Sequence, residues 1–336
     1  MRRIHFLMAL VVVCSFLIVL HGHNATAQSA AEFYKGKTIA VLVGTNAGAS
    51  FDIEARTIIP FVEKYTGAKC LVYNMAAGGG LQARNKLFES KPDGLTIMLS
   101  ENGPKLITAS LFNNEGVRYT WNKFVPLGKI IYSPSTFNIS KKLVYKTPKD
   151  LVGVNFICGT SAPFFEPLFA EALGWNNMKL VPGLSLNERS LAMRRGEIQA
   201  TVGNWFALTQ NADIMVAIAS TSRDEALFPG VPDVGEIVMP GKGKWANYMD
   251  AADTVMFWAI TTPGIPKDRA AYLESILQKT LEDPGYRPAL AKVGEIPPPK
   301  FVTAARLVEM MNAFAAMNPE DIKEMEQVIN RKYIKQ

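Results

Sequence analysis

Residues 38–50 read Thr-Ile-Ala-Val-Leu-Val-Gly-Thr-Asn-Ala-Gly-Ala-Ser, and this stretch decides the fold of the chain. Residues 38–43 are apolar and rich in β-branched side chains, which predicts a short strand buried on both faces. Small residues follow, and apolar side chains then recur at helical spacing from Ile58 to Tyr65, with Gly67 as a typical helix end. A strand, a loop of small residues and a helix form the repeating unit of an α/β protein with parallel strands.

The same order of elements returns further along the chain. A strand over Cys70–Tyr73 precedes the loop Ala76–Gly80, and a strand over Val154–Cys158 precedes the loop Gly159–Pro163. Ser185 with Glu188 forms a capping box, which predicts a helix to Arg195 that Gly196 closes. Further strands are predicted at 95–99, 198–202, 214–219 and 254–261, an extended stretch at 125–139, and helices at 267–281, 303–317 and from Pro319 onward.

These elements predict two α/β lobes, with the second inserted into the first. Val125–Ile139 and Thr254–Thr261 would be the two crossings between the lobes. The predicted division is a leader at 1–27, a discontinuous first lobe at 28–132 and 254–336, and a second lobe at 133–253. Two sequential domains are the alternative, but they would leave the C-terminal helices without an obvious sheet to cover.

The composition excludes several classes of protein. With 48% hydrophobic and 20% charged residues, the chain is neither disordered nor a polytopic membrane protein. Its three histidines, His5, His21 and His23, all lie in the leader, so the remainder has none for a catalytic triad or a histidine-ligated metal. The net charge of +6 is mild and scattered, which gives little support for nucleic-acid binding.

The leader has the features of a cleaved signal peptide. Arg2 and Arg3 are basic, residues 6–20 are apolar, and Ala25-Thr26-Ala27 is a typical cleavage site. A retained membrane anchor is the alternative, but this apolar run is shorter than the ~20 residues that span a bilayer. A lipoprotein is also disfavoured, because Val13 precedes Cys14 where a small residue is required. We therefore expect a periplasmic protein.

Three loops, Gly44–Ser50, Ala76–Gly80 and Gly159–Pro163, share one design in which small residues join a buried strand to a helix. Small residues allow a ligand to approach the backbone, and the start of a helix offers unpaired N–H groups to an anion. Ordinary turn formation is the alternative for each loop alone. Their distribution over both lobes favours an anion-binding cleft.

Two of these loops partly match catalytic motifs. Gly78–Ala83 fits the G-x-G-x-x-A pattern of a dinucleotide site, with Glu101 where a ribose-binding acid would stand. However, a soluble nicotinamide enzyme is not expected outside the cytoplasm. Gly159–Pro163 is similar to a nucleophile elbow around Ser161, but it lacks the final glycine and a histidine partner. We therefore predict that the protein is not an enzyme and uses no cofactor or metal.

Beyond the leader, the cysteines are Cys70 and Cys158, which the predicted division places in different lobes. A disulfide between them would restrict a hinge motion. We expect two unpaired, mostly buried thiols.

Taken together, several short motifs resemble the solute receptors of tripartite tricarboxylate transporters, the Bug family of periplasmic binding proteins. The resemblance runs over most of the chain after the leader. The motifs that carry it are Lys37-Thr38-Ile39 leading to Gly48 and Asp52, Tyr73-Asn74 before Gly79-Gly80, Lys91-Pro92-Asp93-Gly94, Val181-Pro182, Gly196-Glu197-Ile198, Ser222-Arg223, Phe228-Pro229-Gly230-Val231-Pro232 with Glu236, and Thr262-Pro263-Gly264-Ile265-Pro266.

The resemblance implies a type 2, Venus-flytrap architecture that closes on a small carboxylate in the cleft between its lobes. It also implies partners, namely one large and one small membrane subunit, and we expect the receptor to be a monomer. Carried over by position, the candidate ligand-binding residues are Thr45, Asn46, Ala47, Gly48 and Asp52, then Ala77, Gly78 and Gly79, then Thr160, Ser161 and Ala162.

Some assignments remain open at this stage. Asp52 could instead only complement the dipole of its helix. Asn204 and Trp205 follow a predicted strand and could face the cleft, although Trp205 could equally pack in a core. Met75-Ala76-Ala77 replaces the common Arg-Pro-Gly of the family, so the resemblance does not identify the carboxylate. A ligand-sensing role in a signalling system is the alternative to transport.

The first testable prediction concerns maturation. We expect the exported protein to begin at Gln28, within a few residues, because the cleavage signature ends at Ala27. Intact mass measurement of the protein released from the periplasm checks this. Recovery of soluble protein that retains residues 1–27 would contradict the predicted localisation.

Overall fold

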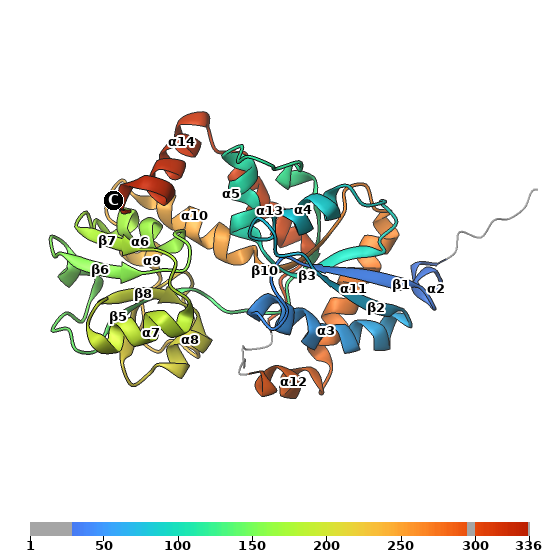
Figure 1. Ribbon diagram of the computed structural model, residues 1–336, viewed down its shortest axis with the longest axis horizontal. Coiled ribbons are helices and arrows are strands. Elements are labelled where there is room, and N and C mark those ends of the chain that lie inside the picture. Colours follow the sequence, from blue (N-terminus) through green and yellow to red (C-terminus); the bar gives the residue numbers. More distant parts are fainter. Residues whose placement is uncertain (1–28, 294–299, 335–336) are drawn as a thin grey trace, which may run out of the picture.

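The apolar runs of the sequence become the strands of two five-stranded sheets, which lie side by side with helices packed around each (Figure 1). These arrangements come from a computed structural model that describes residues 29–293 and 300–334. The predicted leader, residues 1–27, lies outside the described residues. Within the described ranges, no helix combines the length and apolar character that a membrane span requires.

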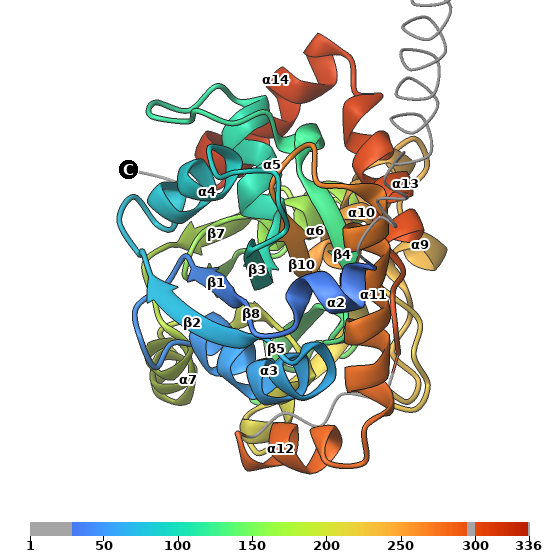
Figure 2. The same cartoon turned by 90° about the vertical axis from the view of Figure 1, so that its right-hand side faces the viewer.

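The first sheet explains why residues 38–43 are continuously apolar. Ile39, Val41 and Val43 face one hydrophobic core, whereas Leu42 faces the other, so both faces of the sheet are buried. Helices α3 (Ser50–Thr66), α11 (Lys267–Glu282) and α12 (Tyr286–Lys292) contribute to one core, and α4 (Leu81–Phe88), α5 (Gly103–Leu111) and α13 (Ala304–Ala315) to the other (Figure 2). The strand order is β2 (Lys69–Asn74), β1 (Thr38–Val43), β3 (Thr96–Asn102), β10 (Met256–Thr261) and β4 (Val125–Gly128).

The second sheet is organised around an aromatic cluster. The rings of Phe137 and Trp175 lie 4.5 Å apart, and Phe156 and Phe169 pack around them. Helix α6 (Phe165–Leu173) is buried along its whole length against this sheet. The strand order is β7 (Met178–Val181), β6 (Phe156–Gly159), β8 (Ala200–Gly203), β5 (Thr136–Ser140) and β9 (Met215–Ser220).

Each sheet contains one strand that arrives from the other side of the molecule. In the first sheet β1 is parallel to β2 and β3, but β10 is antiparallel to both of its neighbours; in the second sheet β5 is the antiparallel strand. The parallel arrangement expected from the sequence therefore describes only part of each sheet. The parallel strands of each sheet end on the side that faces the other sheet. A strand that crosses over from the other sheet begins on that side, so it is antiparallel to them.

The connections between the sheets are a loop and a helix. The stretch expected to be one extended segment, Val125–Ile139, contains β4 and β5 separated by residues 129–135. The return passes through α10 (Gly243–Thr254), which packs against both α6 and α13 and leads directly into β10 (Figure 1). The predicted division into 28–132 with 254–336 and 133–253 stays a prediction.

A buried polar cluster joins the two connections. The backbone N and Oγ of Ser135 each donate a hydrogen bond of 2.9 Å to Oδ1 of Asp253, and Nζ of Lys129 donates one of 2.7 Å to the carbonyl oxygen of Asp253. Lys129 is 2% and Asp253 5% exposed. Burial lowers the pKa of Lys129 to about 8, against the opposing effect of Asp253, whose own pKa is raised by burial.

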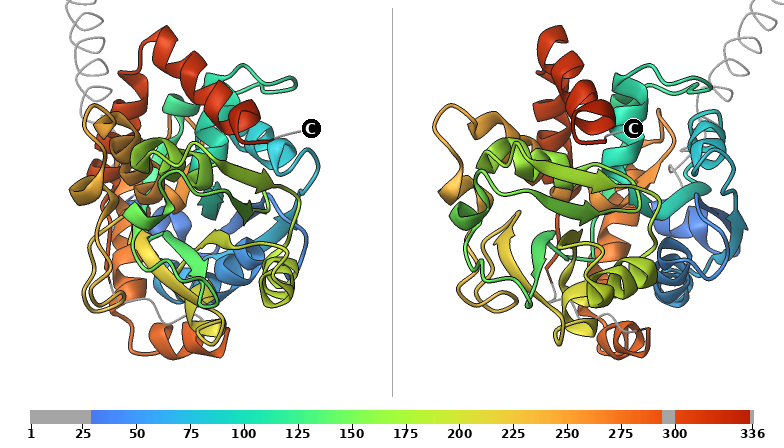
Figure 3. Two further views of the ribbon diagram at one scale, coloured as in Figure 1. Left: turned by 90° about the vertical axis from the view of Figure 1, so that its left-hand side faces the viewer. Right: turned by 60° about the vertical axis from the view of Figure 1, so that its left-hand side comes forward.

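The C-terminal segment also reaches the second sheet. The π-helix Val328–Lys332 packs against α6, where Nζ of Lys332 pairs with Glu171. The hydroxyl of Tyr333 donates to the same carboxylate at 2.7 Å, and the N–H of Leu180 in β7 donates to the carbonyl oxygen of Tyr333. The C-terminal end of the described chain therefore lies beside the second sheet (Figure 3). The remaining elements are α2 (Ala30–Tyr34), η1 (Trp121–Lys123), η2 (Pro148–Leu151), α7 (Leu186–Arg195), α8 (Trp205–Gln210), α9 (Val234–Ile237) and α14 (Pro319–Gln327).

The expectation for the cysteines is confirmed. Cys70 lies on β2 and Cys158 on β6, and both are buried and unpaired. Burial raises the pKa of the Cys70 thiol to about 12 and that of Cys158 well above its usual value, which disfavours the reactive thiolate form of both.

The second prediction tests the cluster at the connections. Asp253→Ala should lower the free energy of unfolding by about 3–5 kcal/mol, because it removes the negative charge that faces the buried Lys129 and the acceptor of the Ser135 hydroxyl. Asp250→Ala on the same helix is the matched control: its side chain is 55% exposed and 3.8 Å from Arg306, so less than about 1 kcal/mol should be lost. Urea unfolding measures both, and equal losses would contradict a structural role for the cluster.

Candidate functional site

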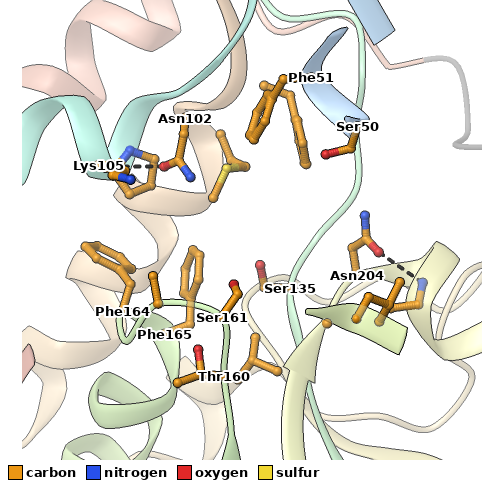
Figure 4. A pocket seen from close by; sticks show the side chains of 18 of the residues that line it. Ser50, Phe51, Asn102, Lys105, Ser135, Thr160, Ser161, Phe164, Phe165 and Asn204 are labelled. Carbon is orange, nitrogen blue, oxygen red and sulfur yellow. Dashed lines mark hydrogen bonds between the residues drawn. The ribbon is translucent and has the colours of Figure 1, made fainter. Parts of the chain in front are cut away.

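A cleft of about 1060 Å³ lies where the carboxyl ends of the parallel strands of both sheets face each other (Figure 4). The first sheet contributes the loop after β1 and the start of α5, and the second sheet contributes the loops after β6 and β8. Ser133 and Ser135 of the first connection line the cleft between these two walls.

On the first wall, the start of α5 supplies a cation. Oδ1 of Asn102 caps this helix by accepting a hydrogen bond of 3.0 Å from the N–H of Lys105. Among the hydrogen bonds and ion pairs of the described residues, none engages Nζ of Lys105. Partial burial, with a contribution from Arg84, lowers the pKa of Lys105.

The second wall consists mainly of the loop after β6. Thr160 is buried, and its N–H donates to the carbonyl oxygen of Val181, whereas Ser161 and Ala162 are exposed to the cleft. Asn204 caps α8 through a hydrogen bond of 3.0 Å from the N–H of Ala207 to its Oδ1.

The other charged residues of this wall make hydrogen bonds within the protein, although Nε of Arg189 has no hydrogen-bond partner among the described residues. Nη1 of Arg189 donates to Oγ1 of Thr201 and to the carbonyl oxygen of Val202, at 2.8 and 2.7 Å. Burial raises the pKa of Glu166, which accepts a hydrogen bond from the N–H of Phe164. Among the described residues, Lys105 is thus the cation of the cleft whose charged group makes no hydrogen bond or ion pair within the protein, whereas Arg189 is held through its Nη1.

The loop Ala76–Gly80 lies behind Lys105 and does not line the cleft. Gly78, Gly79 and Gly80 all have positive φ, and a Cβ added at Gly79 would collide with Nζ of Lys105. Glu101 is the acid that would bind a ribose in a dinucleotide site. Its Oε1 instead accepts a hydrogen bond of 2.6 Å from Nη2 of Arg84, in a buried ion pair. This pairing disfavours the dinucleotide interpretation.

Asp52 fastens the first loop from behind. Its carboxylate accepts hydrogen bonds from the N–H of Gly48 at 2.8 Å, from Nε of Arg56 and from Nδ2 of Asn74, both at 2.9 Å, and it is 2% exposed. Burial alone would raise its pKa, but these hydrogen bonds outweigh burial and lower it. Asp52 therefore ties the loop after β1 to the end of β2.

The structure brings some candidate residues to the cleft and holds others behind it. Those that line the cleft are Gly48, Thr160, Ser161, Ala162 and Asn204. Those outside the lining are Thr45, Asn46, Ala47, Asp52, Ala77, Gly78, Gly79 and Trp205. The assignment of these residues to ligand binding stays a prediction.

Sequence reasoning missed several lining residues, among them Phe51, Asn102, Lys105 and Phe164. The sequence did contain a signal for Asn102 and Lys105. Asn102 followed by Pro104 after an apolar strand is typical of a helix that begins at the carboxyl end of a strand. Over residues 29–293 and 300–334, no group of three or more His, Cys, Asp or Glu residues is arranged to hold a metal ion.

The third prediction separates the tether role of Asp52 from a dipole role. Asp52→Asn should lower the free energy of unfolding at pH 7 by about 1–2 kcal/mol, because hydrogen bonds to a charged group are lost. Since the folded-state pKa lies below 3.8, the stabilisation is present above that pH and disappears as the pH falls through the folded value. The difference between variant and parent should therefore shrink toward pH 3.

The matched control for this prediction is Asp268→Asn, because Asp268 also lies in the first turn of a helix. A dipole effect alone is worth about 0.5 kcal/mol. Urea unfolding at pH 7 and pH 3 measures both variants. Equal losses for the two would leave Asp52 with only the dipole role.

We compared the sequence and the fold of this chain with those of known proteins. No family model matches the chain. A UPF0065 protein of Bordetella bronchiseptica is 24% identical over 231 residues, which cover 63% of this chain and 66% of that protein.

Solved structures match over most of the chain. A ligand-free TctC solute-binding protein from Polaromonas has a TM-score of 0.68 and 16% identity, covering 89% of this chain and 99% of its own. The periplasmic binding protein BugD has a TM-score of 0.60 and 20% identity, covering 88% and 98%. MatC from Rhodopseudomonas palustris with bound malate has a TM-score of 0.58 and 18% identity, covering 88% and 99%. The resemblance stated from the sequence is thereby confirmed, because the structural neighbours are TctC- and Bug-type periplasmic solute-binding proteins, not enzymes, and this chain has their fold.

Proposed function

We propose that this protein is an exported receptor that binds a small carboxylate in the cleft and delivers it to the large and small membrane subunits of a tripartite transporter. The proposal includes a monomeric receptor in the periplasm. The single observation that carries it is the position of Lys105 at the start of α5, in a cleft between two sheets, where no other described residue pairs with its Nζ.

A carboxylate at this position would gain from two groups. The ammonium of Lys105 supplies a positive charge, and the dipole of α5 adds a partial positive charge at the same end of the helix. Partial burial strengthens the interaction, because charges attract more strongly where water is displaced. Malate, the ligand named for MatC, is itself a small carboxylate, which supports this class of ligand but does not identify the one bound here.

Binding on both walls would favour a closed form. Ligand that contacts Lys105 on one wall and the loop Gly159–Pro163 on the other binds the closed form more tightly than the open form. The loop 129–135 and helix α10 are the connections about which such a hinge motion would occur. Closure of this kind would also present a ligand-dependent surface to the membrane subunits.

The fourth prediction tests the carboxylate site. A thermal-shift screen of mono- and dicarboxylates should find at least one that raises the melting temperature, because a ligand that binds only the folded state stabilises it. Lys105→Gln should then weaken calorimetric binding of that carboxylate by at least ~1.4 kcal/mol, about tenfold. Gly79→Val should weaken it as well, since its side chain would displace Lys105 and strain a residue with positive φ.

Lys86→Gln is the control for these variants, because Lys86 is exposed on α4 and lies outside the cleft lining. It should change the affinity by less than about twofold. Arg84→Ala is unsuitable as a control, because it would leave Glu101 buried without its partner. If no carboxylate stabilises the protein, the proposed function is wrong; if one binds and Lys105→Gln leaves its affinity intact, only the assignment of Lys105 is wrong.

A further inference from the structure

Four phenylalanines line the cleft as two pairs on opposite walls. Phe51 and Phe257 come from the first wall, with ring centroids 5.3 Å apart. Phe164 and Phe165 come from the second wall, with centroids 5.0 Å apart in an edge-to-face arrangement. Figure 4 shows Phe51 across the open space from Phe164 and Phe165. Neither the sequence motifs nor the proposed function accounts for these rings.

Phe257 reaches the cleft through an unusual backbone conformation. Its φ is +61°, in the left-handed region that a bulky side chain rarely adopts. The pairing of β10 with β3 shifts register between Met256 and Trp258, so Phe257 stands at a bulge. Among the described residues, the other non-glycine residue with positive φ is Asn113, a type that tolerates this region. Strained residues of this kind are concentrated at ligand sites.

Two polar side chains, Lys105 and Asn102, lie next to the aromatic pairs at one end of the cleft. Lys105 and Asn102 lie beside Phe51 on the first wall and face Phe164 (Figure 4). Glu54 is engaged by the hydroxyl of Ser100 at 2.5 Å, and Nη1 of Arg189 by the second wall, although Nε of Arg189 has no hydrogen-bond partner among the described residues. The cleft thus offers the ammonium of Lys105 and, next to it, apolar surfaces that can approach a ligand from both sides.

We propose that the carboxylate bound here has an aromatic body, an inference that rests on the proposed function. The ring lies between the pair Phe51–Phe257 and the pair Phe164–Phe165 once the cleft closes, and the carboxylate faces Lys105. Offset and edge-to-face contacts between rings favour a flat aromatic ligand beyond the area that it buries. A short hydroxylated dicarboxylate would fill less of the space between the rings, and a hydroxyl or second charge placed against the phenylalanine side chains gains no hydrogen bond from them.

The test compares four carboxylates on the mature protein, of which phenylacetate and cyclohexylacetate match in size. Calorimetric titration with phenylacetate, cyclohexylacetate, succinate and malate separates a flat ring from a saturated one and a monocarboxylate from a dicarboxylate. We expect phenylacetate to bind at least about tenfold more tightly than each of the other three, which corresponds to ~1.4 kcal/mol. Tighter or equal binding of cyclohexylacetate, succinate or malate overturns the aromatic assignment.

Two variants locate the ring. Phe51→Leu should weaken phenylacetate binding by at least about tenfold. Phe33→Leu is the control, because it makes the same exchange on α2, outside the cleft lining, and it should change the affinity by less than about twofold. Phe257→Gly removes the ring and also the strain at φ +61°, because glycine adopts that region freely. Its melting temperature without ligand should stay within about 4 °C of the parent, while phenylacetate binding is lost.

The outcomes distinguish this inference from the proposed function. If succinate or malate binds tightly and Phe51→Leu has no effect, the aromatic inference is wrong although the carboxylate receptor stands. If none of a broad set of carboxylates binds, the proposed function fails first. A large loss of stability in Phe257→Gly, together with unchanged phenylacetate binding by Phe51→Leu, would assign these rings to packing alone and overturn the inference.

Discussion

The exchange of one strand between the two sheets is the constraint on which the rest of this structure depends. Strand β5 follows the first connection into the second sheet, and β10 follows the return into the first, each antiparallel to both neighbours. The two sheets therefore cannot be separated without breaking the order of both. Asp253, Ser135 and Lys129 hold the two connections together by buried hydrogen bonds, so the pivot between the sheets is itself a packed and polar core.

This exchange also decides where a ligand can bind. Because the chain passes between the sheets at the edge where the parallel strands end, the loops after β1, β3, β6 and β8 all face the same cleft. Helix starts and small residues are common at such ends, and here they supply Asn102 and Asn204 as caps. The bulge in β10 that turns Phe257 toward Phe51 belongs to the exchanged strand, so the strand that joins the sheets also shapes their shared cleft.

Much of the fold could be predicted from the sequence, because its strongest signals are local. Continuous apolar runs such as residues 38–43 marked strands buried on both faces, and the capping box at Ser185 with Gly196 marked both ends of α7. Strand direction and the start of the second connection could not be predicted, since they depend on pairing between distant segments. Helix α10 was missed because its apolar side chains contact two partners, α6 and α13, so no single apolar stripe is visible.

The candidate site shows the same division between local and distant information. The glycines of Ala76–Gly80 indicated close approach to an anion, and in the structure Nζ of Lys105 lies close to one of them, Gly79. A Cβ at Gly79 would require Nζ of Lys105 to move and would be strained at positive φ. The same loop packs against Gly44 and, through Arg84, contacts the buried pair with Glu101. Asp52 similarly holds Gly48 from behind. The small residues and acids that stand out in the sequence thus hold the loops in place from behind the cleft. The groups that face the cleft are Lys105 and the paired phenylalanines, and these residue types form no recognisable sequence motif.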